Sequence, residues 1–192
     1  ANLAAVQANI AAAAERAGRS ADEVRLLPVS KTVPEDRLCL AIAAGCHRLG
    51  ENKVQEAKRK SESLARLGVD WAVIGHLQTN KAKDVASFAT EFQALDNLRV
   101  AQALDRRLTD LGRTLEVYVQ VNTSAEESKF GLPPEELAGF LRELPRYETL
   151  RVQGLMTLAL FTSDTDRVRE CFRTLRTLRD RMREESPDLI GT

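Results

Sequence analysis

Lys31 occupies the position in this sequence best suited to covalent chemistry. It follows residues 26–30 (Leu-Leu-Pro-Val-Ser), an apolar run that predicts a buried strand. A lysine at the inner end of such a strand loses hydration, which disfavours its charged ammonium form. The neutral amine is the form that bonds to an aldehyde as a Schiff base. The alternative is a structural lysine whose ammonium reaches solvent, which is the commoner arrangement at a strand end.

Polar residues also follow other predicted strands. Asn52 comes after Gly50 and Glu51, where the glycine gives the backbone freedom to aim both side chains at a ligand. Asn52 could instead only cap the next helix. His76 lies in the loop at residues 74–81, a natural anion or hydrogen-bonding site, although a lone histidine is usually structural. Asn122 stands where a barrel side chain would face the mouth.

Short apolar strands alternate with amphipathic helices along the chain. The pattern predicts strands at residues 24–31, 48–51, 71–75, 92–95, 115–121 and 152–157. It predicts helices at residues 2–17, 34–44, 53–67, 80–88, 97–111, 133–144 and 164–185. In the third helix the inward positions are expected to be Val54, Ala57, Ser61 and Leu64. In the last they are expected to be Val168, Phe172, Leu175 and Met182.

This alternation implies parallel strands joined by right-handed crossovers, as in a doubly wound sheet or a closed barrel. A doubly wound sheet that binds a nucleotide would have a glycine-rich loop after its first strand, and residues 30–34 contain no glycine. Polar residues after many strands are instead typical of a barrel. We therefore expect an α/β fold of the (β/α)8 TIM type, with six strands identified and an extra N-terminal helix. Residues 1–192 are expected to form a single domain.

Composition excludes several classes of protein. Lys plus Arg and Asp plus Glu each total 28, so the net charge is zero, unlike the basic excess of most nucleic-acid-binding proteins. The arginines of the last helix are interleaved with acidic residues and indicate a solvated helix face. No apolar run is long enough to span a membrane, and the N-terminus does not read as a secretory signal, so a cytoplasmic protein is expected.

A metal site is not predicted. The three cysteines (Cys39, Cys46 and Cys171) lack the close paired spacing of a zinc site, and only His47 and His76 could join them. Buried free thiols are the expected state of these cysteines.

Several sequence blocks together resemble the pyridoxal-phosphate homeostasis proteins, which are single-domain relatives of the alanine-racemase-type barrels. The blocks are Val29-Ser30-Lys31-Thr32, Gly50 to Glu56, Ile74 to Lys81, Val121-Asn122, Ser128-Lys129-Phe130-Gly131 and Gly154-Leu155-Met156-Thr157. They occur in the same order and at similar spacing in the family. The resemblance covers residues 1–189.

The resemblance implies a barrel that carries pyridoxal 5′-phosphate as a Schiff base on Lys31. Asn52 would lie beside the cofactor ring and Met156 near the phosphate end, with His76 and Asn122 as further cofactor-binding residues. The family binds, buffers or delivers the cofactor and so affects amino-acid and keto-acid homeostasis, with no established turnover. We therefore expect a cytoplasmic monomer that is not an enzyme and uses no metal.

The sequence departs from the family pattern at its end. Family members continue with a Ser-x-Gly-Met-Ser loop and an Arg-x-Gly strand end, which hold the cofactor phosphate. Residues 187–192 end where the first of these would begin. The comparison thus predicts that the C-terminal strands of the barrel are missing here.

The main alternative is a pyridoxal-phosphate-dependent amino-acid racemase or lyase. Racemisation needs a second acid or base on the opposite face of the cofactor adduct, commonly a tyrosine from an added domain or a partner subunit. The chain has only Tyr118 and Tyr147. The first is predicted within a strand and the second after a helix, so the sequence favours cofactor binding without catalysis.

Overall fold

The computed structural model describes residues 2–124 and 130–191. Its strands are β1 (Arg48–Glu51), β2 (Asp70–Val73), β3 (Glu91–Leu95), β4 (Leu115–Gln120) and β5 (Leu150–Met156). Its α-helices are α1 (Asn2–Arg16), α2 (Glu35–Ala43), α3 (Val54–Ser63), α4 (Ala82–Phe88), α5 (Leu98–Leu111), α6 (Leu137–Glu143) and α7 (Thr165–Glu185). Short 3-10 helices cover Ala21–Glu23, Ala65–Leu67, Thr79–Lys81, Pro134–Glu136, Leu144–Arg146 and Pro187–Leu189.

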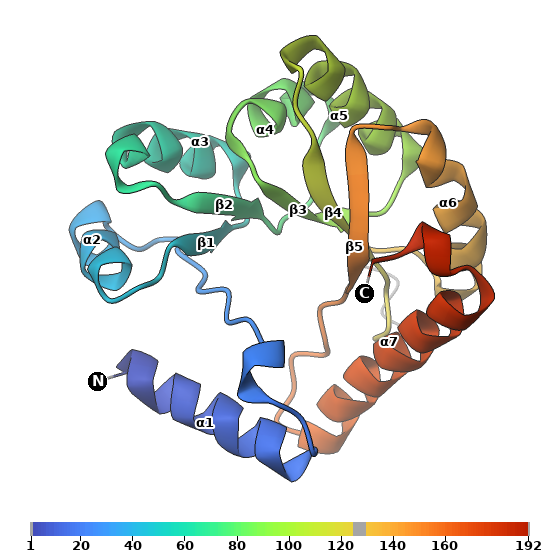
Figure 1. Ribbon diagram of the computed structural model, residues 1–192, viewed down its shortest axis with the longest axis horizontal. Helices are drawn as coiled ribbons and strands as arrows, with labels where there is room; N and C mark the ends of the chain where they lie inside the picture. Colours follow the sequence, from blue (N-terminus) through green and yellow to red (C-terminus); the bar gives the residue numbers. More distant parts are fainter. Residues whose placement is uncertain (1, 125–129, 192) are drawn as a thin grey trace.

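The five strands form one parallel sheet in the order β1-β2-β3-β4-β5. Figure 1 shows the strands along an arc, with α2 to α6 on its outer side. Each crossover thus moves the chain one strand further in the same direction, which is the topology of a (β/α)8 barrel. A doubly wound sheet would reverse its strand order at a switch point. The predicted barrel-type fold is confirmed.

The main hydrophobic core lies between the sheet and its outer helices. Phe92 and Leu95 of β3 are fully buried, and so are Leu104 and Leu108 on one face of α5. The helix begins at Asn97, whose side chain accepts a hydrogen bond from the N–H of Val100, and ends at Gly112 in the left-handed conformation. This packing fixes the direction of the strands and therefore the position of the loops that follow them.

The strand predicted at residues 24–31 is wrong over most of its length. Only Val29 bridges to Gly50 of β1, through hydrogen bonds from Gly50 N–H to the Pro28 carbonyl and from Ser30 N–H to the Gly50 carbonyl. In this register the next rung would require a donor at residue 28, and a proline has no N–H. The ladder therefore stops at Pro28, and the segment reaches Lys31 as a nearly unpaired extended chain.

A buried carboxylate holds the start of this segment against the sheet. Glu91, fully buried at the beginning of β3, forms ion pairs with Arg25, at 2.6 Å, and with Arg48 at the beginning of β1. Arg25 also lies 3.4 Å from the hydroxyl of Tyr118 in β4. Burial raises the pKa of Tyr118, and the negative charge of Glu91 raises it further. These contacts replace the missing strand pairing at the amino ends of the strands.

Three smaller predictions are also wrong. Phe172 is exposed, and the buried positions of α7 are Cys171, Leu178 and Met182. The helix predicted at residues 80–88 begins later, at Ala82, because a 3-10 helix covers Thr79–Lys81 before it. The cysteines are free, but Cys39 is exposed and Cys46 only half-buried, so Cys171 is the buried thiol.

Among the described residues, no helix is both long and apolar enough to cross a lipid bilayer.

Candidate cofactor site

The residues predicted to form the site all lie at the carboxyl ends of the strands. Asn52 directly follows β1, His76 follows β2, Asn122 follows β4, Met156 ends β5, and Lys31 comes just after the bridge at Val29. Because the strands are parallel and adjacent, these positions share one rim of the sheet. The structure therefore brings the predicted residues to the same side of the molecule.

Lys31 stands on this rim as an exposed lysine in a tight turn, so the loss of hydration expected for it at the end of a buried strand is wrong. Its ammonium makes no hydrogen bond or ion pair with the residues that the structure describes. Thr32, the next residue, has φ of 62°, which places a β-branched side chain in the left-handed region. The Thr32 hydroxyl donates to the Lys31 carbonyl at 2.6 Å, and Val33 N–H donates to the Ser30 carbonyl at 3.1 Å.

A buried ion pair lies directly behind this turn. Lys60 of α3 and Glu51 of β1 are both fully buried, with Lys60 Nζ 2.5 Å from Glu51 Oε1. Lys60 Nζ also donates to the Ser30 carbonyl at 2.7 Å. The Ser30 hydroxyl donates to Glu51 Oε1 at 2.7 Å. The residue before Lys31 is thus fixed through both its carbonyl and its hydroxyl.

Glu56 extends this cluster to the other side of Lys31. Its Oε1 accepts from Lys60 Nζ at 2.8 Å and from the N–H of Thr32 at 3.1 Å. Burial alone would lower the pKa of Lys60, but the hydrogen bonds to Glu51 and Glu56 outweigh it and raise that pKa above its ordinary value. The hydrogen bond from Lys60 lowers the pKa of Glu56. Lys60 and Glu56 are therefore both charged at neutral pH.

The loops after β1 and β2 are in close backbone contact. An added Cβ atom on Gly75 would lie 2.1 Å from the carbonyl oxygen of Asn52. Such a distance is possible only for a glycine. The glycine therefore lets the loop that carries His76 pass against the loop that carries Asn52.

An aromatic pair links the loops after β2 and β4. The rings of His76 and Phe130 stack with their centroids 4.0 Å apart and their planes 11° from parallel. Both residues are exposed. Next to Phe130, the N–H of Gly131 donates to Asp96 after β3 at 3.0 Å. The pair thus offers planar apolar surface on the rim. Ser128 and Lys129, which belong to the same family-like sequence block as Phe130, lie outside the described residues.

The remaining predicted residues lie at the β4–β5 side of the rim. Asn122 is half-buried, and its Oδ1 accepts from the N–H and the hydroxyl of Ser124 at 3.2 and 3.0 Å. Met156 is half-buried, and its carbonyl accepts from Val121 N–H. Just beyond, the hydroxyls of Thr123 and Thr157 are 2.8 Å apart. The contacts of Met156 with Val121 and of Thr123 with Thr157 tie the two strand ends together.

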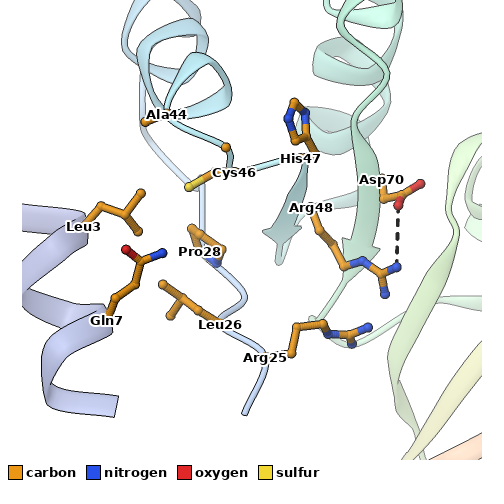
Figure 2. Close-up of a pocket in the computed structure, with 11 residues that line it drawn as sticks. Leu3, Gln7, Arg25, Leu26, Pro28, Ala44, Cys46, His47, Arg48 and Asp70 are labelled. Carbon is orange, nitrogen blue, oxygen red and sulfur yellow. Dashed lines mark ion pairs between the residues drawn. The ribbon is translucent and has the colours of Figure 1, made fainter. Parts of the chain in front are cut away.

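A separate cavity of about 370 Å³ lies at the opposite ends of the strands. Figure 2 shows Leu3 and Gln7 of α1 on one side of it and Arg25, Arg48 and Asp70 on the other. No residue predicted for the cofactor site lines this cavity. The described residues contain no group of three or more histidines, cysteines and acidic residues that could hold a metal ion.

Sequence reasoning missed the supporting cluster of Ser30, Glu51, Glu56 and Lys60. Ser30 and Glu56 were identified only as members of the family-like blocks, and Lys60 was given no role. Glu51 was expected to aim at a ligand, but it is fully buried and paired with Lys60. One signal was present: Glu56 and Lys60 are four residues apart on one helix face, in the order that favours an ion pair.

Comparisons with known proteins agree with the fold. The family model of the alanine racemase N-terminal domain matches residues 1–190. A pyridoxal phosphate homeostasis protein of Pasteurella multocida is 34% identical over 189 residues, which cover 97% of this chain and 81% of that protein.

Two solved structures are also similar to this chain. A protein of unknown function from Bifidobacterium adolescentis is 33% identical with a TM-score of 0.88, covering 94% of this chain and 77% of that one. The structure of PipY from Synechococcus elongatus with PLP bound is 30% identical with a TM-score of 0.78, covering 85% and 76%. The family model and these relatives show that the chain belongs to the pyridoxal phosphate homeostasis protein family, whose fold is that of the alanine racemase N-terminal domain.

Proposed function

We propose that this protein binds pyridoxal 5′-phosphate through a Schiff base on Lys31 and buffers or delivers it, as a cytoplasmic monomer without catalytic turnover. The observation that carries the proposal is Lys31 itself. Its amine is exposed and makes no pairing with the described residues. It lies on the rim where the other predicted residues follow the carboxyl ends of the strands. A homologous structure, PipY, has PLP bound.

The residues of this chain fit the cofactor chemically. Lys31 Nζ, once deprotonated, attacks the aldehyde carbon; a C=N bond forms and the aldehyde oxygen leaves as water. The bound cofactor supplies an electron sink for reactions at amino-acid carbons. The planar His76–Phe130 pair offers apolar contact area, and Asn52 and Asn122 offer amide groups to an aromatic ligand with polar substituents. Met156 contributes a flexible apolar side chain.

The positions of the two tyrosines support binding without racemisation. Tyr118 lies within β4 and its hydroxyl contacts Arg25 near the amino ends of the strands. Tyr147 follows α6 and precedes β5, also at the amino end. Neither tyrosine therefore stands at the rim beside Lys31, where a second acid or base would be needed.

Borohydride trapping tests the proposed Schiff base. The protein is incubated with pyridoxal 5′-phosphate, reduced, digested and mapped by mass spectrometry. We expect one stable adduct per chain, on Lys31, and none in Lys31→Arg. Lys53→Arg, which changes an exposed lysine close by in the sequence, should label like the parent. A label on Lys81, or no label at all, would overturn the proposal.

Addition of D- or L-alanine separates binding from catalysis. We expect a change in the visible absorption of the loaded protein, with the added enantiomer unchanged in chiral chromatography. Appearance of the opposite enantiomer, absent from a Lys31→Arg sample, would show a racemase instead.

A further inference from the structure

We infer that Glu56 and Lys60 are positioning residues for Lys31, which hold the turn on both sides of it in the geometry that bonds the cofactor aldehyde. The inference rests on the proposed function, because it assigns these residues a role in the same site. Neither residue needs to touch the cofactor. Their effect passes through the backbone of Ser30 and Thr32.

The turn that carries Lys31 needs external support. Thr32 adopts a left-handed conformation that β-branched residues rarely accept without surrounding structure that enforces it. The preceding segment offers little such structure, since its strand pairing ends at Pro28. The turn is held instead by side chains of α3.

Lys60 supplies the support on the N-terminal side of Lys31. Its ammonium has three donors, and the structure gives it three acceptors: the Ser30 carbonyl, Glu51 Oε1 and Glu56 Oε1. With all donors used and the side chain fully buried, Lys60 is not a competing amine for the aldehyde. Glu51 and Glu56 balance the charge of Lys60. Its third hydrogen bond, to the Ser30 carbonyl, holds the residue before Lys31 in position.

Glu56 supplies the support on the C-terminal side. Its Oε1 joins Lys60 to the N–H of Thr32, so one carboxylate oxygen connects the buried ammonium to the residue after Lys31. Glu56 and Lys60 are one helical turn apart on α3, and both therefore face the same turn. Because Lys53, the N-cap residue of α3, directly follows Asn52, the helix also links the Lys31 turn to the next loop of the rim.

Two substitutions at Glu56 separate this role from a general contribution to folding. Glu56→Gln removes the charge but keeps an oxygen that can accept from Thr32 N–H. Glu56→Ala removes the acceptor. Glu62→Ala is the matched control, because it makes the same change on an exposed position of the same helix. Each full-length variant is first shown to be folded by circular dichroism and urea unfolding.

The equilibrium constant for pyridoxal 5′-phosphate on Lys31 is then measured from the visible absorption of the Schiff base. We expect Glu56→Ala to bind about tenfold more weakly than the parent, the effect of losing one hydrogen bond to a charged group. Glu56→Gln should recover most of that loss, and Glu62→Ala should bind as the parent does. Amide exchange at Thr32, measured without cofactor, should accelerate in Glu56→Ala alone.

The outcomes distinguish the two proposals. If the parent protein forms no Schiff base on Lys31, the proposed function fails, whereas the Thr32 exchange result still reports on the turn. If the parent binds and Glu56→Ala matches Glu62→Ala in both affinity and exchange, the positioning role alone is overturned. Weaker binding in Glu56→Ala that Glu56→Gln does not recover would likewise contradict it, because the acceptor oxygen would then be irrelevant.

Discussion

The backbone carbonyl of Asn52 lies so close to Gly75 that a Cβ atom there would stand 2.1 Å from its oxygen. No other side chain fits at residue 75 without displacement of one of two rim loops. These loops carry Asn52 and His76, two residues that we propose for the cofactor site. The glycine is thus a requirement of the site as well as of the fold.

Gly75→Ala tests this relationship. Because the conflict is with backbone rather than with a flexible side chain, we expect a loss of about 1–3 kcal/mol in the free energy of unfolding. We also expect weaker pyridoxal 5′-phosphate binding, since the Asn52 loop must move. Urea unfolding and cofactor titration check the two effects. Gly139→Ala is the control: it lies in α6 with no atom within 4 Å of the new Cβ, and should be neutral or stabilising. Equal effects at both glycines would contradict the argument.

The sequence was enough to predict the alternation of strands and helices and the positions of the rim residues. It was not enough to predict the conformation of residues 24–31 or the supporting cluster. Hydrophobic periodicity reports which residues are buried, so it located β1 to β5. It also suggested a strand at residues 24–31, because periodicity does not register that Pro28 lacks the donor for the next rung.

Lys60 is a buried residue that hydrophobic periodicity failed to predict. In α3 the apolar spacing predicted Ser61 as an inward position beside Val54, Ala57 and Leu64, whereas the structure buries Lys60. Residues 60 and 61 both lie near that face, and a lysine is almost never fully buried unless it is paired. Its partner Glu51 is on a different element, so the pairing appears only after folding.

Removal of the buried ammonium should be costly. In Lys60→Met, Glu51 stays buried without a cation, and we expect the free energy of unfolding to fall by about 3–5 kcal/mol. The double variant Lys60→Met/Glu51→Gln removes the uncompensated charge and should recover a large part of the loss. Lys58→Met removes a more exposed ion pair with Asp84 from the same helix and should cost no more than about 1 kcal/mol. Urea unfolding of the four proteins gives the values.

A double variant no more stable than Lys60→Met would contradict the ion-pair explanation. The loss would then arise from the size and shape of the lysine side chain.

Acid should weaken the same cluster. The hydrogen bond from Lys60, followed by that from the Thr32 N–H, holds the pKa of Glu56 below its ordinary value of 4.5. A carboxyl whose pKa is depressed in the folded state contributes stability that is present above 4.5 and is lost as the pH falls through the folded-state pKa. We therefore expect the stability difference between the parent and Glu56→Gln to be largest near neutral pH and to shrink below 4.5. Urea unfolding across this range measures it, and a difference that stays constant with pH would contradict the assigned shift.

The His76–Phe130 stack should couple the loops after β2 and β4. Stacked rings are worth about 0.5–1.5 kcal/mol beyond the area they bury, and the exposure of both residues places this pair at the lower end. A double-mutant cycle with His76→Leu, Phe130→Leu and the combined variant measures the coupling in urea unfolding. His76→Phe keeps a ring at this position and should preserve stability. If the two leucine substitutions are additive, the rings do not stabilise one another. The planar surface assigned to the cofactor rim would then depend on each side chain separately.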